Sequence, residues 1–178
     1  MRTLDRRPSI LGLIAAAALL GPWSFAAHAA EDSSALAKRV QVLEDREAIR
    51  ALITAYGYAH DHRDYKTFAS LFASNGEWVG GLGTAKGPEA IFALMDKAIG
   101  HKPVAEGSGT VHLMTNDQIR IDGDRATAET KWLYLVPGDG GAPRAQFLGH
   151  YVDQFIREKG VWKFLRREAP VDIAPKRQ

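Results

Sequence analysis

Four long segments with the composition of β-strands make up most of the second half of the chain, and only short turns separate them. The segments are residues 110–121, 125–136, 144–157 and 161–168. The Asp-Gly-Asp and Glu-Lys-Gly sequences between them are typical of tight hairpins, because glycine and aspartate tolerate the backbone conformations that such turns need. Strands joined in this way pair antiparallel, so this half is predicted to form a mainly antiparallel sheet.

Helical patterns occupy the first half of the chain. From residue 33 to about Asp61, apolar residues recur every three or four positions with charged residues between them, which predicts a long amphipathic helix. A second, short helix is expected over residues 65–72, stopping at residues 74–76, and a third begins at Pro88, because proline is favoured in a first helical turn. A brief strand at residues 77–79 leads into a glycine-rich hairpin.

Helices followed by consecutive strands predict an α+β domain. In the expected architecture, three N-terminal helices pack in the concave face of a curved, mostly antiparallel sheet, which gives a cone-like α+β barrel. A concave face of this kind leaves a pocket between the two layers, and polar residues along that pocket are the place to look for chemistry.

The first 29 residues have the parts of an export signal. A basic start precedes an uncharged apolar run at residues 10–20, and Ala27-His28-Ala29 is a small-x-small cleavage site. The run of about eleven residues is shorter than the roughly 20 that cross a bilayer. We therefore expect cleavage after Ala29 and a periplasmic or secreted protein. A membrane-bound N-terminus is the alternative, and Arg6-Arg7 leaves a twin-arginine route open.

Residues 30–178 are expected to form one domain, as is usual at this length. Basic and acidic residues are equal in number in this part, although the whole chain has 23 Lys and Arg against 21 Asp and Glu. A neutral domain has no general attraction for nucleic acid or anionic lipid, so neither nucleic-acid binding nor stable membrane insertion after processing is expected. The chain has no cysteine, which excludes disulfides, cysteine-ligated metals and thiol nucleophiles.

Asp61 and His112 are the first candidates for chemistry. A carboxylate at the C-terminal end of a helix is unfavourable with the helix dipole, which makes Asp61 unusual. Strand alternation places His112 on one face with Thr110, Met114 and Asn116. Imidazole ionises near neutral pH, as a general base must. From the residues alone, a solvated aspartate and a structural histidine remain the alternative.

Other polar residues are less informative. Arg166 and Arg167 are adjacent in a strand and must point to opposite faces, but alternation does not decide which of them faces the interior. His60 and His62 could offer two metal ligands, yet no third ligand is evident, so no metal site is predicted.

The order of these elements and several short sequences resemble the SnoaL-like branch of the nuclear transport factor 2-like superfamily. The resemblance runs from about Leu36 to Glu168, nearly the whole expected domain. The sequences that carry it are residues 45–50, 56–61, 76–78, 86–90, 110–116, 123–126, 149–151 and 160–164. Several of them are especially similar to the dehydrochlorinases of this branch, and the tyrosine five residues before Asp61 is similar to one in its bile acid 7α-dehydratases.

The resemblance implies a catalytic Asp–His pair at Asp61 and His112, an active-site arginine at Arg167 and an active-site tyrosine at Tyr56. Four further residues are expected to line the substrate pocket: Trp78, Met114, Asn116 and Trp132. The implied protein is a lyase that needs no metal and no organic cofactor.

In the implied reaction, His112 removes a C–H proton from a small hydrophobic substrate, cyclic or steroid-like, and water or halide is lost. An isomerase with the same kind of pocket and a non-catalytic periplasmic binding protein are the alternatives. The convex face of the sheet is free for association, so we expect a homodimer or homotrimer.

Overall fold

The computed structural model describes residues 23–102, 104–105 and 109–175. Most of the expected export signal, residues 1–22, lies outside this range. The chain divides into two compact units between Val40 and Gln41, and helix α1 (Trp23–Asp61) contributes to both. The second unit contains the C-terminal part of α1 and all the elements that follow it. Within the described residues, no helix combines the length and apolar character needed to cross a membrane.

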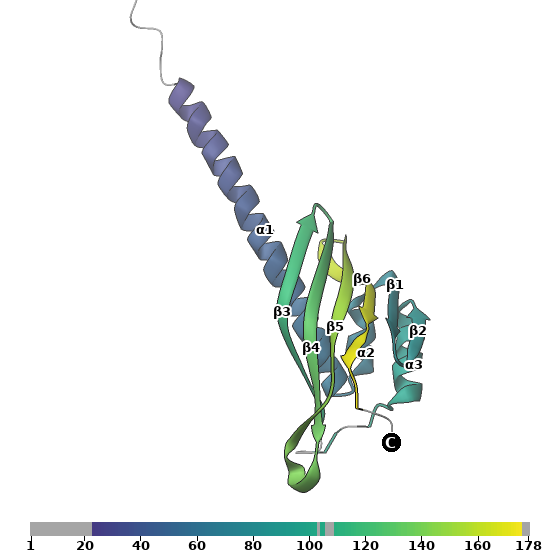
Figure 1. The fold of residues 1–178 in the computed structure, drawn as a ribbon. Coiled ribbons are helices and arrows are strands. Elements are labelled where there is room, and N and C mark those ends of the chain that lie inside the picture. Colours follow the sequence, from purple (N-terminus) through teal and green to yellow (C-terminus); the bar gives the residue numbers. More distant parts are fainter. Residues whose placement is uncertain (1–22, 103, 106–108, 176–178) are drawn as a thin grey trace, which may run out of the picture. The chain divides into compact units, whose positions relative to one another are not determined.

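Three helices and a seven-stranded sheet form the fold (Figure 1). After α1 come α2 (Tyr65–Ser70), β1 (Phe72–Gly80), β2 (Gly83–Lys86), α3 (Pro88–Ala98), β3 (Val111–Asp122), β4 (Arg125–Pro137), the short 3-10 helix η1 (Asp139–Gly141), β5 (Pro143–Glu158), β6 (Val161–Ala169) and β7 (Val171–Ile173). The strand order is β2-β1-β6-β5-β4-β3, with β7 paired to β5. Among the strands of the described residues, only β1 and β6 pair in parallel.

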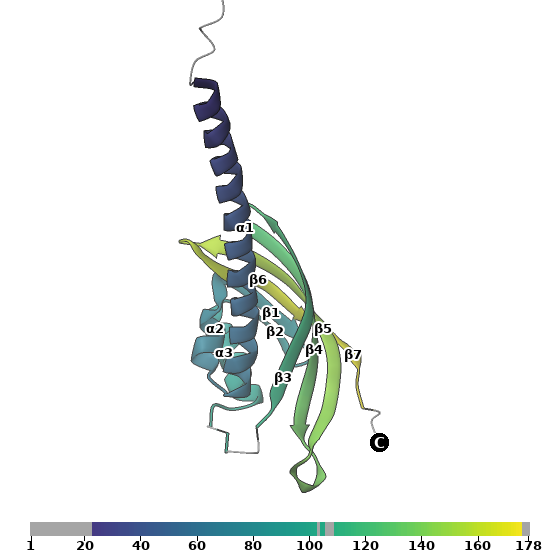
Figure 2. The same ribbon diagram turned by 90° about the vertical axis from the view of Figure 1, so that its left-hand side faces the viewer.

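The predicted α+β class is confirmed: α2, α3 and the C-terminal part of α1 cover one face of a curved, mostly antiparallel sheet (Figure 2). The core fills the space between these two layers. Among the side chains with no exposed surface are Ile49 of α1, Phe68 of α2, Ile91 and Met95 of α3, and Phe164 of β6. Burial of each large apolar side chain stabilises the fold by about 1.5–3 kcal/mol.

The buried face of α1 differs from the predicted one at residues 43–45. The apolar spacing of the sequence includes Leu43, yet this side chain is 63% exposed, whereas Asp45, one of the charged residues between the apolar positions, is 5% exposed. Asp45 is buried because Arg157 and Trp162 donate hydrogen bonds to its carboxylate at 2.7 and 3.2 Å. The bond from Arg157, above all, holds the pKa of Asp45 below its usual range even though burial opposes this.

The second helix is shorter than predicted, and the first strand is longer. The sequence predicts a helix through Phe72, but α2 ends at Ser70 and β1 begins at Phe72. The reason is long-range pairing: the backbone N–H of Phe164 donates to the Leu71 carbonyl at 3.0 Å, and Phe72 pairs with Phe164 in the parallel ladder. Strand β7, which no pattern in the sequence predicts, adds a short pairing to β5.

Candidate active site

The end of α1 and the start of β3 bring a carboxylate against an imidazole. Asp61 is the last residue of α1, and His112 is the second residue of β3. The Nδ1 atom of His112 lies 2.6 Å from Oδ1 of Asp61, and the backbone N–H of His112 donates to Oδ2 at 2.8 Å. The side chain of His112 is 9% exposed and that of Asp61 is 13% exposed. Because an ionised carboxylate only accepts, the hydrogen of His112 resides on Nδ1, and Nε2 carries the basic lone pair.

A glycine on α1 lets the helix lie this close to β3. A Cβ atom at Gly57 would lie 2.3 Å from the terminal methyl group of Met114 and 3.5 Å from Cβ of His112. The helix then stops at Asp61, and Arg63 adopts the left-handed conformation that commonly follows a helix end (φ 57°). A positive charge on His112 would be favourable at this negative end of the helix dipole.

A second imidazole lies beside the dyad. The rings of His60 and His112 are 4.6 Å apart between centroids, at 66° to each other. Burial is the main cause that lowers the pKa of His60 to about 3, and electrostatic repulsion from His112 is the second. The His60 side chain is therefore neutral at physiological pH. Its Nδ1 is buried and has no hydrogen-bond partner among the described residues. His62, the other histidine that the sequence offered as a metal ligand, has its Nδ1 atom 2.8 Å from the Tyr58 carbonyl at the surface.

His60, Asp61 and His112 also form a group that could hold a metal, because one ligand atom from each lies within 4.8 Å of the others. Two histidines and a carboxylate are a common ligand set for zinc and iron. However, the 2.6 Å separation of Nδ1 and Oδ1 is a hydrogen-bond distance. Two such ligands on one tetrahedral zinc would stand about 3.3 Å apart. As it stands, the arrangement suits proton transfer, and a metal would have to open the dyad.

Of the two adjacent arginines, Arg167 faces the interior and Arg166 the surface side. Arg166 pairs with Glu77 and with Glu168 and is about one-third exposed. Arg167 has no exposed surface. Its Nε and Nη2 atoms donate to the two carboxylate oxygens of Asp153 at 2.7 and 2.6 Å. Asp153, also fully buried, was missed from the sequence, where it looks like any polar residue of an alternating strand.

Aromatic rings enclose this buried ion pair. The guanidinium carbon of Arg167 lies 4.1, 4.0 and 4.1 Å from the ring centroids of Tyr56, Tyr151 and Phe164. Burial would lower the pKa of Arg167, but the charge and hydrogen bonds of Asp153 hold it above its usual value. The arginine therefore stays charged, and its charge is matched by Asp153 within the core.

Tyr56 and Trp78 belong to the same buried network. The indole N–H of Trp78 donates to the hydroxyl oxygen of Tyr56 at 2.9 Å, and both side chains are almost completely buried. Burial raises the pKa of Tyr56, so the phenol remains protonated. In the sheet, Trp78 pairs with Arg167 and Arg167 with Asp153, which aligns these residues across three strands.

Of the other predicted pocket residues, Met114 and Trp132 lie near the dyad, whereas Asn116 does not face it. Met114 and Trp132 face each other across β3 and β4, and the Trp132 ring lies 6.4 Å from that of His112. Met114 also lines a hollow of about 150 Å³ between α1 and these strands, together with Ile53 and Thr130.

Alternation predicts that Asn116 shares the face of His112, but the structure does not place it there. It is exposed, with a left-handed φ of 55°, in a β-bulge between Thr115 and Gln118 that interrupts the alternation.

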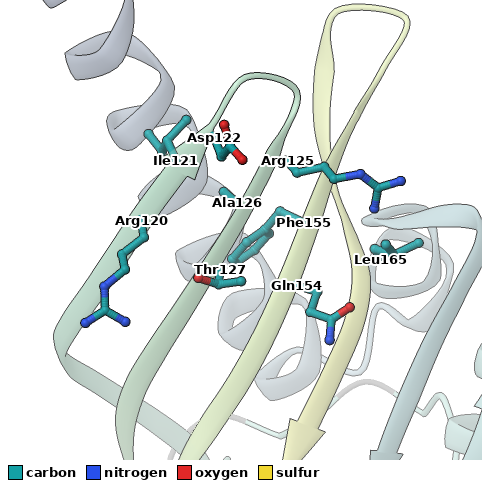
Figure 3. A pocket seen from close by; sticks show the side chains of 9 residues that line it. All are labelled: Arg120, Ile121, Asp122, Arg125, Ala126, Thr127, Gln154, Phe155 and Leu165. Carbon is teal, nitrogen blue, oxygen red and sulfur yellow. The ribbon is translucent and has the colours of Figure 1, made fainter.

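Another hollow, of about 250 Å³, lies near the β3–β4 turn and contains none of these residues (Figure 3). Residues of β3, β4, β5 and β6 line it. Arg120 and Arg125 extend away from each other there, so they do not form a joint anion site (Figure 3).

Known proteins resemble this chain over most of the second unit. Residues 41–168 match the SnoaL-like domain. The gamma-hexachlorocyclohexane dehydrochlorinase of Sphingobium indicum is 29% identical over 129 residues, which cover 71% of this chain and 80% of that protein.

Two solved structures illustrate the likeness in fold. An NTF2-like protein with a cystatin-like fold from Novosphingobium aromaticivorans is 31% identical, with a TM-score of 0.67 over 77% of this chain and 88% of that one. The crystal structure of LinA is 26% identical, with a TM-score of 0.64 over 76% of this chain and 90% of that one.

Proposed function

Because the chain belongs to the SnoaL-like family of the NTF2-like superfamily, we propose that it is a lyase that removes water or halide from a small hydrophobic molecule without a cofactor. The relatives at modest identity include proteins named as dehydrochlorinases, which are lyases. The observation that carries the proposal is the hydrogen-bonded pair of Asp61 and His112, 2.6 Å apart and largely shielded from water.

In the proposed reaction, Nε2 of His112 takes a proton from a carbon atom of the substrate. The electron pair of the broken C–H bond forms a carbon–carbon double bond, and the leaving group departs from the neighbouring carbon with its bonding pair. Asp61 holds the imidazole in the required tautomer and stabilises its positive charge. A well-placed general base of this kind contributes roughly 10²–10⁴ in rate.

For Arg167 and Tyr56 we propose a supporting role. Three aromatic rings enclose Arg167, and two hydrogen bonds join one edge of its guanidinium to Asp153, so its contacts favour a residue that holds Tyr56 in place. Tyr56 in turn lies beside His60, with ring centroids 6.5 Å apart. We therefore propose that Arg167 and Asp153 fix the position of Tyr56 beside the site, and that the dyad of Asp61 and His112 carries out the proton transfer.

The test is turnover of a panel of β-hydroxy ketones and chlorinated cyclohexanes, with products identified by mass spectrometry. A lyase gives a product lighter by water or hydrogen chloride, and His112→Ala abolishes turnover while the circular dichroism spectrum is unchanged. Full activity of His112→Ala would exclude the mechanism. A product of unchanged mass would indicate an isomerase, and saturable binding without any product would indicate a binding protein.

We also propose that the protein is exported, as its N-terminal sequence predicts, and that it assembles with copies of itself. Support for self-association comes from the outer face of the sheet, where aliphatic side chains stand in register across β3, β4, β5 and β7. They are Leu113, Leu133, Leu148 and Ile173. Three of them are strongly exposed, at 49%, 36% and 65% for Leu113, Leu148 and Ile173.

A further inference from the structure

The aliphatic side chains on the outer face of the sheet form a row that a second copy of the chain can match. This aliphatic row crosses the face that the helices leave uncovered (Figure 2) and consists of Leu113, Leu133, Leu148 and Ile173, on β3, β4, β5 and β7. When two such sheets stack about a two-fold axis parallel to their strands, each row meets itself in reversed strand order. An axis between β4 and β5 lays Leu133 on Leu148 of the partner subunit. It also lays Leu113 on Ile173 of the partner subunit, so the whole row is matched.

A polar cluster of Lys131, His150 and Asp172 lies beside the aliphatic row on the same face. Nδ1 of His150 in β5 lies 2.7 Å from Oδ1 of Asp172 in β7. Lys131 of β4, which pairs with His150 in the ladder, donates to Oδ2 of Asp172 at 3.3 Å. The side chains of His150, Asp172 and Lys131 are 25%, 31% and 43% exposed, respectively. A partner that covers the aliphatic row therefore also covers the polar cluster.

Two orientations of a two-fold axis match the aliphatic row with itself, and the polar cluster distinguishes them. An axis along the row would lay the polar cluster on the next row of the face, where Val111 pairs with Leu135. That contact would bury charge against aliphatic side chains without a partner, which is costly. An axis parallel to the strands instead lays Lys131 on His150 of the partner subunit, one strand spacing of about 4.8 Å from Asp172 of the partner subunit. Lys131 then meets a carboxylate across the interface, so this axis is the favourable one.

We propose, resting on the self-association proposed above, that His150 makes the contact between two copies dependent on pH, so that association weakens as the pH falls. Imidazole is the side chain that changes its charge between pH 5 and 8. A neutral His150 can lie against Lys131 of the partner subunit. A protonated His150 would bring two positive charges together there and would lose its hydration on burial. The bond to Asp172 does not offset this cost, because the single chain already has it.

Charged groups on the adjoining strands also face this part of the outer sheet. They are Lys131 and Glu129 of β4, Asp172 of β7 and Glu168 of β6, which pairs with the residue two positions after His150. Burial opposes ionisation of Asp172, but hydrogen bonds from His150 and Lys131 hold the pKa of this carboxyl below its usual value. Carboxylates and amines ordinarily ionise outside the range between pH 5 and 8. His150 is therefore the member of the polar cluster whose charge changes in this range.

Sedimentation velocity of the full chain over a concentration series, at pH 8 and at pH 5.5, tests this proposal. The dissociation constant of the dimer is expected to be at least about tenfold larger at pH 5.5, because each of its two histidines can contribute up to about tenfold per pH unit. His150→Gln keeps an N–H donor for Asp172 but does not titrate, so its dissociation constant should differ less than about threefold between the two pH values. His101→Gln, at a histidine that is 72% exposed, is the matched control and retains the pH dependence.

Lys131→Glu tests the sign of the effect. It places a carboxylate against His150 of the partner subunit, so association should tighten as the pH falls, while circular dichroism at both pH values shows an unchanged fold. Wild-type association that is independent of pH, or tighter at pH 5.5, overturns the inference and leaves self-association standing. A pH dependence that persists in His150→Gln, or a wild-type trimer, overturns it as well. A wild-type chain that is monomeric at pH 8 contradicts the self-association proposal itself.

Discussion

Replacing Asp61 by asparagine tests the dyad without changing its shape. The carboxylate accepts from both Nδ1 and the backbone N–H of His112, at 2.6 and 2.8 Å. In Asp61→Asn, the side-chain oxygen can keep the backbone bond, but the amide then directs its NH₂ group at Nδ1. An NH₂ group donates, so Nδ1 must lose its hydrogen and Nε2 must gain it. The variant then has the proton on the atom that should act as the base.

The magnitude follows from the bond that is lost. A charge-assisted hydrogen bond between groups this shielded is worth about 1.5–3 kcal/mol. Loss of that stabilisation alone slows proton abstraction by roughly tenfold to a hundredfold, at tenfold per 1.36 kcal/mol. The wrong tautomer adds to this, and the same substitution in a serine-protease triad lowers the rate about 10⁴-fold. We therefore expect a loss of about 10³-fold or more in turnover.

The tautomer itself can be measured without a substrate. Two-bond ¹⁵N–¹H correlation spectra of the histidine rings distinguish a proton on Nδ1 from one on Nε2. Wild-type His112 is expected to carry it on Nδ1 at pH 8, and Asp61→Asn to carry it on Nε2. Asp61→Glu is the control that retains an acceptor. An unchanged Nδ1–H tautomer in Asp61→Asn, or activity within a few-fold of wild type, would refute the reasoning.

Three further predictions concern His60, the buried ion pair and the outer face of the sheet. The folded chain keeps His60 neutral down to about pH 3, whereas the unfolded chain protonates it below about pH 6.5, so stability falls with decreasing pH in this window. His60 contributes at most about 1.4 kcal/mol per pH unit to the slope of the unfolding free energy against pH. Urea unfolding at several pH values should show a smaller slope in His60→Phe. Parallel plots of unfolding free energy against pH for the two proteins would disprove this. Asp153→Asn leaves the Arg167 charge uncompensated in the core and should lower the unfolding free energy by about 3–5 kcal/mol. Arg166→Gln should lower it by about 1 kcal/mol or less, because the pair of Arg166 and Glu168 is partly solvated. Equal losses in the two variants would contradict the burial argument. Leu148→Glu should convert a dimer or trimer to a monomer by light scattering after size exclusion, and a monomeric wild-type protein would end the assembly proposal.

Local patterns predicted most of the fold because they depend on neighbours in the chain. The four long strands follow from the hairpin turns between them, and α1 ends at Asp61 as its periodicity predicts. The failures are long-range. Phe72 is in a strand only because β6 pairs beside it, and Asp45 is buried only because Arg157 and Trp162 bond to it.

The same distinction applies to the site. Asp61 and His112 could be proposed from their residue types and from the family resemblance. The pairing of Asp153 with Arg167 depends on the register between β5 and β6, which no local pattern specifies. The neutral state of His60 depends on burial among residues of other elements, and the outward position of Asn116 depends on a bulge. Such features depend on tertiary structure and become visible only there.

The two halves of the dyad are separated by 51 positions along the chain. Neither the isolated helix nor the isolated hairpin of β3 and β4 can orient the imidazole, because each supplies only one of the two groups. The orientation of the imidazole is therefore a property of the docked sheet and helix, and secondary structure alone does not provide it. The His112 tautomer is for this reason a direct spectroscopic reporter of native topology, visible even in a variant that turns over no substrate.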